Sequence, residues 1–148
     1  MTKVSTFRLY LMRALYLLIA IGLGSLIWPG IIHHPKPWTH MQGVANAFMG
    51  ALSALALVGV RYPLQMLPLL LFELLWKTIW IVAIGLPLYF AGQLTGPNAD
   101  TMRDCLPGLI ICPLVIPWGY VFRNYILKPA DRWTGAANPS SAGVSARA

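Results

Sequence analysis

The sequence predicts an all-α membrane protein, organised as a bundle of four transmembrane helices. Of the 148 residues, 57% are hydrophobic and only 10% are charged, whereas soluble domains typically carry about 25% charged residues. The mean hydropathy is +0.65. Crossing a hydrocarbon core of about 30 Å takes about 20 apolar residues per helix. Four stretches approach that length, at positions 14–32, 44–60, 64–90 and 106–125.

The first span follows a short basic segment, residues 1–13, which also resembles the start of a secretory signal peptide. The segment 25–29 lacks the small residues that a signal peptidase needs, so we expect an uncleaved helix. Trp28 suits the membrane interface, and Pro29 and Gly30 are helix breakers, so the helix is expected to end there.

The second span, 44–60, follows a proline- and histidine-rich segment, 33–40, that we expect to be a loop outside the hydrocarbon. Small residues spaced by four let helices approach closely in lipid, and this span has two such rows: Gly43, Ala47 and Ala51, and Gly50 and Ala54. The turn at 61–63 predicts that the second and third spans pair as a helical hairpin.

The fourth span, 106–125, is the least regular of the four. It contains Pro107, Pro113 and Pro117, and a polar loop is expected before it at 92–104. Proline removes backbone hydrogen bonds, so we expect this span to be kinked or partly unwound, with neighbouring segments satisfying the freed carbonyls.

The transmembrane domain is expected to cover 1–133, and the Ala-, Gly- and Ser-rich segment 134–148 to be a disordered cytoplasmic tail. Basic residues near the span ends favour the cytoplasmic side. An arrangement with both termini in the cytoplasm of a bacterial inner membrane leaves Lys36 and Arg103 outside, and places the following residues inside: Lys3, Arg8, Arg13, Arg61, Arg123, Lys128, Arg132 and Arg147.

The sharpest chemical feature is a pair of opposite charges within the third span, Glu73 and Lys77. A charge at mid-membrane costs roughly 2.5–3.5 kcal/mol on insertion scales, so such residues are usually paired or functional. A spacing of four puts both on one helix face, with Glu on the favourable N-terminal side. One interpretation makes Glu73 a proton or cation site tuned by Lys77. The other, which we favour, is an internal clamp, because a self-neutralised pair leaves no net charge for a substrate.

Two tryptophans, Trp76 and Trp80, flank this pair away from the usual interfacial belt. They are candidates for contact with a flat ligand such as a quinone, although packing of large rings is the commoner role. A second candidate group is His33, His34 and His40, whose imidazoles are candidates for binding a metal or haem, or for responding to pH. These histidines have no Cys or carboxylate partner in their loop, so a polar interfacial loop is the simpler interpretation.

The net charge of +7 would suggest a nucleic-acid partner in a soluble protein. Here the basic residues lie beside apolar runs, so we expect the lipid bilayer as the partner and no nucleic acid. The chain contains no phosphate-binding loop, nucleophile elbow or HExxH zinc helix. Cys105 and Cys112, separated by about 10 Å along a helix, are too distant for a disulfide. We therefore expect no enzyme activity and assign no cofactor.

The layout resembles that of small four-helix bacterial inner-membrane proteins, including DoxX-like families. The features that carry this resemblance are a basic start, a short first loop, a tight turn after the second span and a basic end, over residues 13–133. The segments 61–68, 72–77 and 116–118 look like those of uncharacterised membrane proteins. The resemblance implies association with quinone-linked sulfur oxidation or oxidative-stress complexes, and it transfers no catalytic residue.

Three functions remain open on the sequence alone. The first is a non-enzymatic accessory or assembly subunit that forms a homo-oligomer or binds another membrane protein. The second is a small proton-coupled transporter with Glu73 as its titrating site. The third is a redox membrane subunit that binds quinone near Trp76 and Trp80, or haem through the histidine loop.

Overall fold

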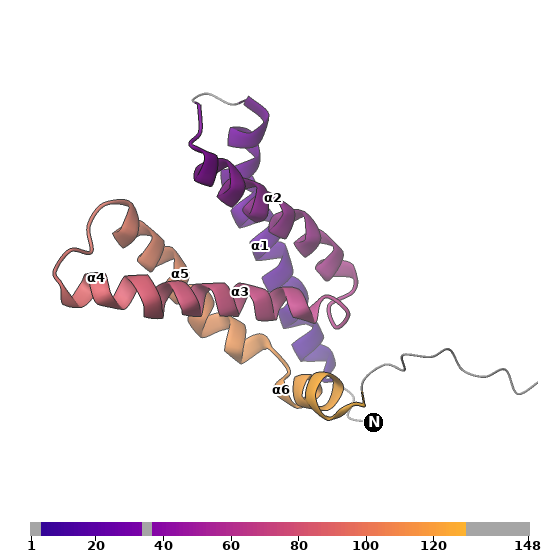
Figure 1. Ribbon diagram of the computed structural model, residues 1–148. Coiled ribbons are helices and arrows are strands. Elements are labelled where there is room, and N and C mark those ends of the chain that lie inside the picture. The colour runs from indigo at the N-terminus through magenta and orange to yellow at the C-terminus, as the bar shows by residue number, and fades with distance from the viewer. Residues whose placement is uncertain (1–3, 34–36, 130–148) are drawn as a thin grey trace, which may run out of the picture.

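The computed structural model describes residues 4–33 and 37–129, and these are almost entirely helical (Figure 1). Two long helices, α1 (Thr6–His33) and α2 (His40–Arg61), form an antiparallel pair. The third is continuous through three segments, α3 (Leu67–Trp80), the π-helical turn η1 (Ile81–Gly85) and α4 (Leu86–Phe90). It packs against α5 (Pro97–Val115), which leads into a short C-terminal arm made of α6 (Trp118–Val121) and η2 (Phe122–Leu127).

The all-α membrane fold is confirmed within the described residues. Three helices are long and apolar enough to cross a membrane: α1, α2 and the continuous helix Leu67–Phe90. A fourth span exists only if α5 and the arm α6–η2 are taken together, and these are bent by 69° at Ile116–Pro117. The break lies at the last of the three prolines, where Ile116 adopts an extended conformation with ψ of 125°. The remaining two prolines are accommodated inside α5.

Several helix boundaries differ from those expected. The first helix begins at Thr6 instead of position 14, so most of the basic segment is helical, and α2 begins at His40, at the end of the expected loop 33–40. The first helix continues through Pro29 to His33, because α2 packs alongside and Trp28 donates a hydrogen bond from Nε1 to Ser53 Oγ, 2.9 Å away. The expected polar loop 92–104 is wrong in its second half, because α5 begins at Pro97. Proline is favoured in the first turn of a helix, and Gly96 supplies the positive φ of 55° that turns the chain into it.

The expected hairpin between the second and third spans is not formed. The tight turn is present, with Met66 N–H donating to Tyr62 O, yet α3 leaves it at a steep angle to α2 (Figure 1). The principal partner of α2 is α1, and that of α3 is α5. The molecule is therefore two helical pairs joined by the turn.

A small core joins the two pairs at the end where α3 begins. It includes Met12 and Tyr16 from α1, Leu67 and Leu70 from α3, and Ile116 after α5, all with no exposed surface. Tyr16 links three segments: its ring lies against Gly59 of α2, and its hydroxyl donates to Pro63 O at 3.1 Å. Because Gly59 has no side chain, α1 and α2 approach closely here.

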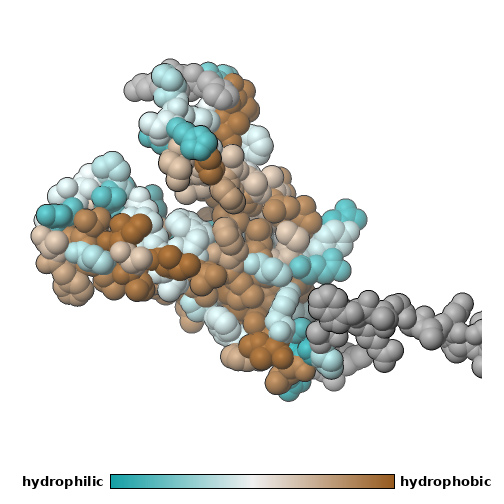
Figure 2. All heavy atoms as spheres, viewed as in Figure 1, coloured by the Kyte–Doolittle hydropathy of each residue, from teal (hydrophilic) through white to brown (hydrophobic). Residues whose placement is uncertain are grey.

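Away from this core the helices are largely uncovered. At most 28% of the most apolar stretch of any of the three spanning helices is buried inside the chain. Hydrophobic residues cover most of the helix shafts, and hydrophilic residues gather toward their ends (Figure 2). In water such a surface would aggregate, whereas lipid tails solvate it. The described surface is therefore that of a membrane-embedded protein.

Candidate functional site

The two charges of the third helix lie together in the contact between α3 and α5. Lys77 Nζ is 2.6 Å from Glu73 Oε1, and the side chains are only 14% and 6% exposed. The helical repeat brings residues four apart onto one face, which accounts for this pairing from local sequence alone. The pair is enclosed because α5 packs over this face of α3.

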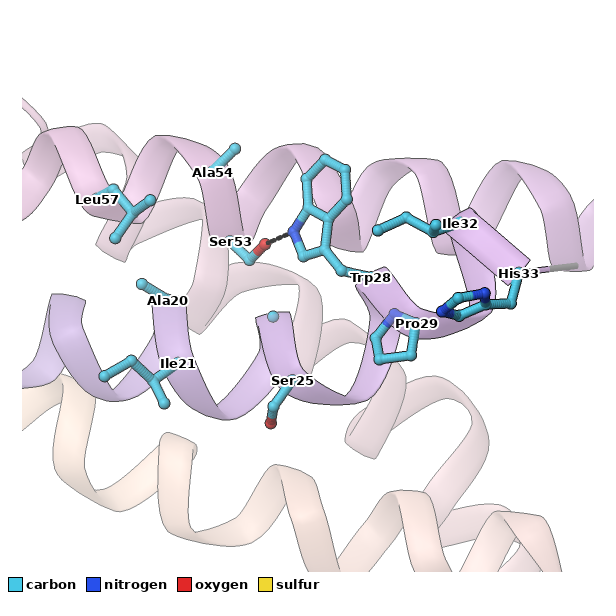
Figure 3. Close-up of a pocket in the computed structure, with 11 residues that line it drawn as sticks. Ala20, Ile21, Ser25, Trp28, Pro29, Ile32, His33, Ser53, Ala54 and Leu57 are labelled. Atoms are coloured by element: carbon cyan, nitrogen blue, oxygen red, sulfur yellow. Dashed lines mark hydrogen bonds between the residues drawn. The ribbon is translucent and has the colours of Figure 1, made fainter.

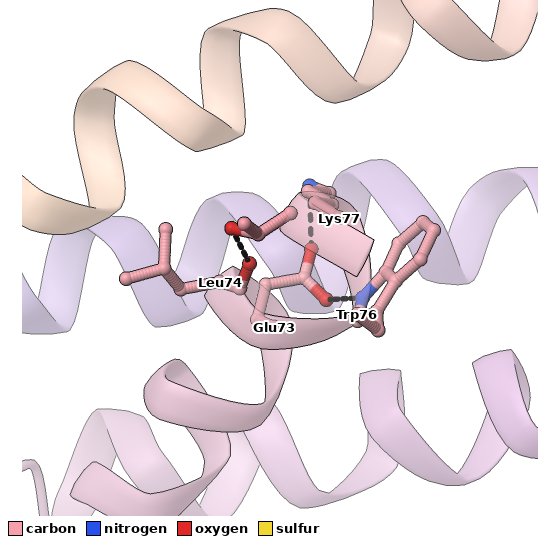
Figure 4. Close-up of polar contacts among 5 residues, drawn as sticks. Glu73, Leu74, Trp76 and Lys77 are labelled. Atoms are coloured by element: carbon pink, nitrogen blue, oxygen red, sulfur yellow. Dashed lines mark hydrogen bonds and ion pairs between the residues drawn. The ribbon is translucent and has the colours of Figure 1, made fainter. Parts of the chain in front are cut away.

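Trp76 donates a hydrogen bond to the second oxygen of the same carboxylate (Figure 4). Its indole Nε1 donates to Glu73 Oε2 at 2.6 Å, and its ring centroid lies 5.5 Å from Lys77 Nζ. Tryptophan Nε1 is a donor only, so the carboxylate oxygen is the acceptor of this hydrogen bond. Both carboxylate oxygens thus have partners on the same helix, and the lysine has a favourable ring contact.

The opposite wall of the site is Gly108 of α5. A Cβ built at Gly108 would lie 2.5 Å from Lys77 Nζ and 3.0 Å from its Cδ. Only a residue without a side chain leaves room for the lysine to lie across α5 here. Gly108 is not among the site residues predicted from the sequence, where only its neighbour Pro107 was considered, as a cause of a kink in the span. A glycine beside a proline in an apolar span is the signal that was available.

Two free thiols lie on the same side of α5 as Gly108. Cys105 and Cys112 are 2% and 1% exposed, with spacings of three and four from the glycine. Both lie within electrostatic range of Lys77 and Glu73. Within the described chain, however, no three His, Cys, Asp or Glu side chains are placed to hold a metal ion. The thiols act here as small apolar groups that fill the helix contact.

Trp80 lies one turn beyond the pair, at the start of the π-helical turn. Its ring edge would be 3.1 Å from a Cβ at Gly85, and Met102 of α5 borders the same glycine. Trp76 and Trp80 are both partly buried. The first contacts Glu73 and Lys77, and the second lies against Gly85. Their expected contact with a quinone stays a prediction.

The histidines are not brought together with this site. His33 ends α1 and His40 begins α2, both exposed at the far end of that helical pair, while His34 lies outside the described residues. Thr39 caps α2, where its hydroxyl accepts from Gln42 N–H and its own N–H donates to the Gln42 side chain. This capping box accounts for the start of α2 without any bound ligand.

A separate open groove, of about 540 Å³, lies between α1 and α2 (Figure 3). Its lining is mostly apolar, with Ser25, Trp28 and Ser53 near its middle and His33 at one end. The Trp28 indole and the Ser53 hydroxyl satisfy each other, and Ser53 in turn donates to Gly50 O at 2.9 Å. The groove therefore offers a long apolar surface with few unengaged polar groups.

Gly108→Ala should loosen the contact between α3 and α5. The added methyl group requires Lys77 Nζ to move, which stretches its ion pair with Glu73. Because a lysine side chain is flexible, we expect a loss of about 1–3 kcal/mol, typical of overpacking, visible as a lower melting temperature in detergent. Gly119→Ala in α6 is the matched control, since nothing lies within 4 Å of its added Cβ. An unchanged melting temperature for Gly108→Ala would contradict this account of the site.

Comparison with protein-family models, with curated protein sequences and with solved structures finds no match for this chain.

Proposed function

We propose that this chain is a non-enzymatic accessory or assembly subunit of a bacterial inner membrane, which acts by binding another membrane protein or further copies of itself. The observation that supports this most is the set of contacts made by the Glu73 carboxylate. Both of its carboxylate oxygens are occupied by side chains of its own helix, at 2.6 Å each. An ion pair of this kind contributes to helix packing. Because both carboxylate oxygens already have partners, little of the carboxylate is accessible to a substrate.

The same geometry weighs against Glu73 as the titrating site of a transporter. A proton carrier needs a carboxyl group that exchanges protons with water at a working pH. Here a lysine and an indole N–H contact both carboxylate oxygens, and the side chain is only 6% exposed, so water has little access to it. Neither the α1–α2 groove nor the smaller pocket near Arg8 and Arg123 includes Glu73.

The uncovered helix surface supports a role in assembly. Large apolar side chains such as Phe48, Phe72 and Leu75 are 66%, 48% and 58% exposed. In a bilayer these side chains contact lipid or partner helices. The exposed row Ala47 and Ala51 of α2 would permit a close helix contact.

For the orientation, we propose that both termini are cytoplasmic. Arg8, Arg61 and Arg123 lie at one end of the described helices, and Arg103 lies at the other with Asp100 and Asp104. This distribution follows the positive-inside rule.

Purification of the tagged protein in a gentle detergent tests this function. We expect a partner protein at a fixed ratio, or a defined homo-oligomer, together with a colourless sample. The control is the same tag on an unrelated inner-membrane protein of similar length. A Soret absorbance band or extractable quinone would contradict the proposal and favour the redox role suggested by the DoxX-like layout. Proton flux in liposomes that disappears in Glu73→Gln would contradict it in favour of a transporter.

A further inference from the structure

The bend between α5 and the C-terminal arm α6–η2 is fixed by a specific hydrogen bond. Pro117 has no backbone N–H, so the carbonyl of Pro113, one turn earlier, lacks its usual helical donor. The indole Nε1 of Trp118 donates to that carbonyl instead, at 2.8 Å. Ile116, between the two helices, is extended. The 69° bend is therefore held in place by the chain's own contacts.

The bend lies at the end of the molecule where α1 and α3 begin. Ile116 and Val121 belong to the core that also contains Met12 of α1 and Leu67 of α3. Figure 1 shows α6 beside the N-terminal end of α1, and α5 running back along α3 in the opposite direction. By the time it bends, α5 has returned from the end of the molecule that contains Asp100.

The lengths of α5 and of the arm indicate how they share one crossing. The apolar part of α5, residues 105–115, extends about 17 Å, short of a hydrocarbon core of about 30 Å. α6 and η2 comprise four and six residues and extend about 15 Å. In line, the two would suffice. At 69°, however, the arm advances only about 5 Å along the direction of α5. Most of its length therefore runs crosswise.

The arm has two faces of different polarity. Residues spaced by four lie on one face of a helix, and an apolar row of this kind consists of Trp118, Phe122 and Ile126, which are 39%, 52% and 62% exposed. Two residues turn a helix by about 200°, so the row shifted by two lies on the opposite face. This polar row consists of Tyr120, Asn124 and Lys128.

The headgroup region of a lipid leaflet is the partner that fits these two faces. Tryptophan and tyrosine concentrate at this level, and the arm exposes both Trp118 and Tyr125. A helix with one apolar and one polar face lies in the plane of the interface, with the apolar side about 5–10 Å deep. A transmembrane helix of a partner protein would follow α5, whereas the arm is turned away from that direction.

We propose that the arm α6–η2 lies flat in the headgroup plane of one leaflet, with its apolar row among the lipids and its polar row in water. The fourth crossing then consists of α5 with the arm lying across its end as an anchor. Trp118 positions the arm through its bond to Pro113 O. This inference does not depend on the accessory function. The proposed orientation decides only that the leaflet is the cytoplasmic one.

Spin labels on single introduced cysteines test this placement in the full chain in bilayers, through their accessibility to oxygen and to a water-soluble nickel complex. The native Cys105 and Cys112 are 2% and 1% exposed, and wild type treated with the label is the blank. We expect labels in Phe122→Cys and Ile126→Cys to report lipid at depths that agree within about 3 Å, because four residues of a crossing helix would differ by about 6 Å. A label in Asn124→Cys should report water.

Two labelled positions outside the arm provide references. Phe72 is exposed on a spanning helix, and Asp100 is exposed at the polar start of α5. Depths that differ by about 6 Å between the Phe122 and Ile126 labels would show that the arm crosses. Labels that neither reagent reaches would show a protein partner on the arm, and water at all three positions would place it outside the lipid. Each of these results would overturn the proposal, and a partner bound elsewhere on the chain would change none of them.

Trp118→Phe tests the bond that holds the bend. It keeps an aromatic ring but leaves Pro113 O without its donor, so we expect the label in Phe122→Cys to become more mobile. Trp28→Phe is the matched control, because it also removes an indole N–H, the one that donates to Ser53 at a distance from the arm. An unchanged spectrum in Trp118→Phe, or an equal change in Trp28→Phe, would overturn the positioning role of Trp118.

Discussion

Glu73→Ala is expected to destabilise the protein strongly, and the double variant Glu73→Ala, Lys77→Ala to recover most of the loss. The single substitution leaves Lys77 enclosed by α5 with no counter-charge, whereas in the wild type its Nζ is 2.6 Å from the carboxylate. Removing one partner of a buried pair typically costs about 3–5 kcal/mol, and removing both is far cheaper. The level of protein in membranes, measured by quantitative immunoblot, and the melting temperature in detergent report both effects.

An exposed carboxylate supplies the control for this experiment. Asp100 pairs loosely with Arg103 at 3.7 Å, and its side chain is 68% exposed. We expect Asp100→Ala to change stability by less than about 1 kcal/mol, as is usual for surface ion pairs. Normal membrane levels of Glu73→Ala, or a double variant as unstable as the single one, would show that the pair does not act as a clamp.

Gly59→Ala is the second substitution for which we expect a large effect. An added methyl group would overlap Cδ1 of Tyr16 and lie 2.6 Å from Cε1 and 2.7 Å from Cγ. The Tyr16 ring is fully buried, so it cannot move aside without breaking its hydrogen bond to Pro63 O. We expect a loss of about 1–3 kcal/mol or more, since overpacking and a stranded hydroxyl both contribute. Thermal melting in detergent measures the loss.

Two further variants separate this contact from a general effect of replacing glycine. Gly22→Ala in α1 adds the same methyl group where nothing lies within 4 Å, so its stability should be unchanged or slightly higher. Combining Gly59→Ala with Tyr16→Leu should recover part of the lost stability. If Gly22→Ala were as harmful as Gly59→Ala, the close approach of α1 and α2 at Tyr16 would not be the cause.

The membrane fold could be predicted because hydropathy is a local property of each segment. Composition and the apolar runs were sufficient to place α2 and the helix from Leu67 to Phe90 within about one helical turn, whereas α1 begins at Thr6 and not at position 14 as expected. Boundaries at proline were less accurate. Pro29 remains helical because α2 supports α1 there, and Pro97 starts a helix instead of interrupting one. Tertiary packing decides the first case, whereas the second follows the local preference of proline for the first turn of a helix.

Of the candidate site, only the part formed by α3 could be predicted from the sequence. Glu73 and Lys77 are four residues apart on one helix, so their spacing alone indicated that they would meet. The hydrogen bond from Trp76 to the same carboxylate was not expected. Gly108 is on another helix, and its role depends on how α3 and α5 cross. The expected hairpin of the second and third spans pointed to α2 as the neighbour, which is the wrong helix. Which side chains meet across a helix contact can be predicted only when the packing of the two helices is known.

The division into two helical pairs has a consequence for biosynthesis. A chain leaves the ribosome from its N-terminus, so α3 emerges before the part of α5 that contains Gly108. During that interval Glu73 and Lys77 have each other but lack their outer wall, and they face lipid or the insertion machinery. The first pair, α1 and α2, has emerged by then, but the core that Met12 and Tyr16 share still lacks its later residues, such as Ile116. The Glu73–Lys77 pair therefore stays uncovered during synthesis until α5 has been inserted beside α3.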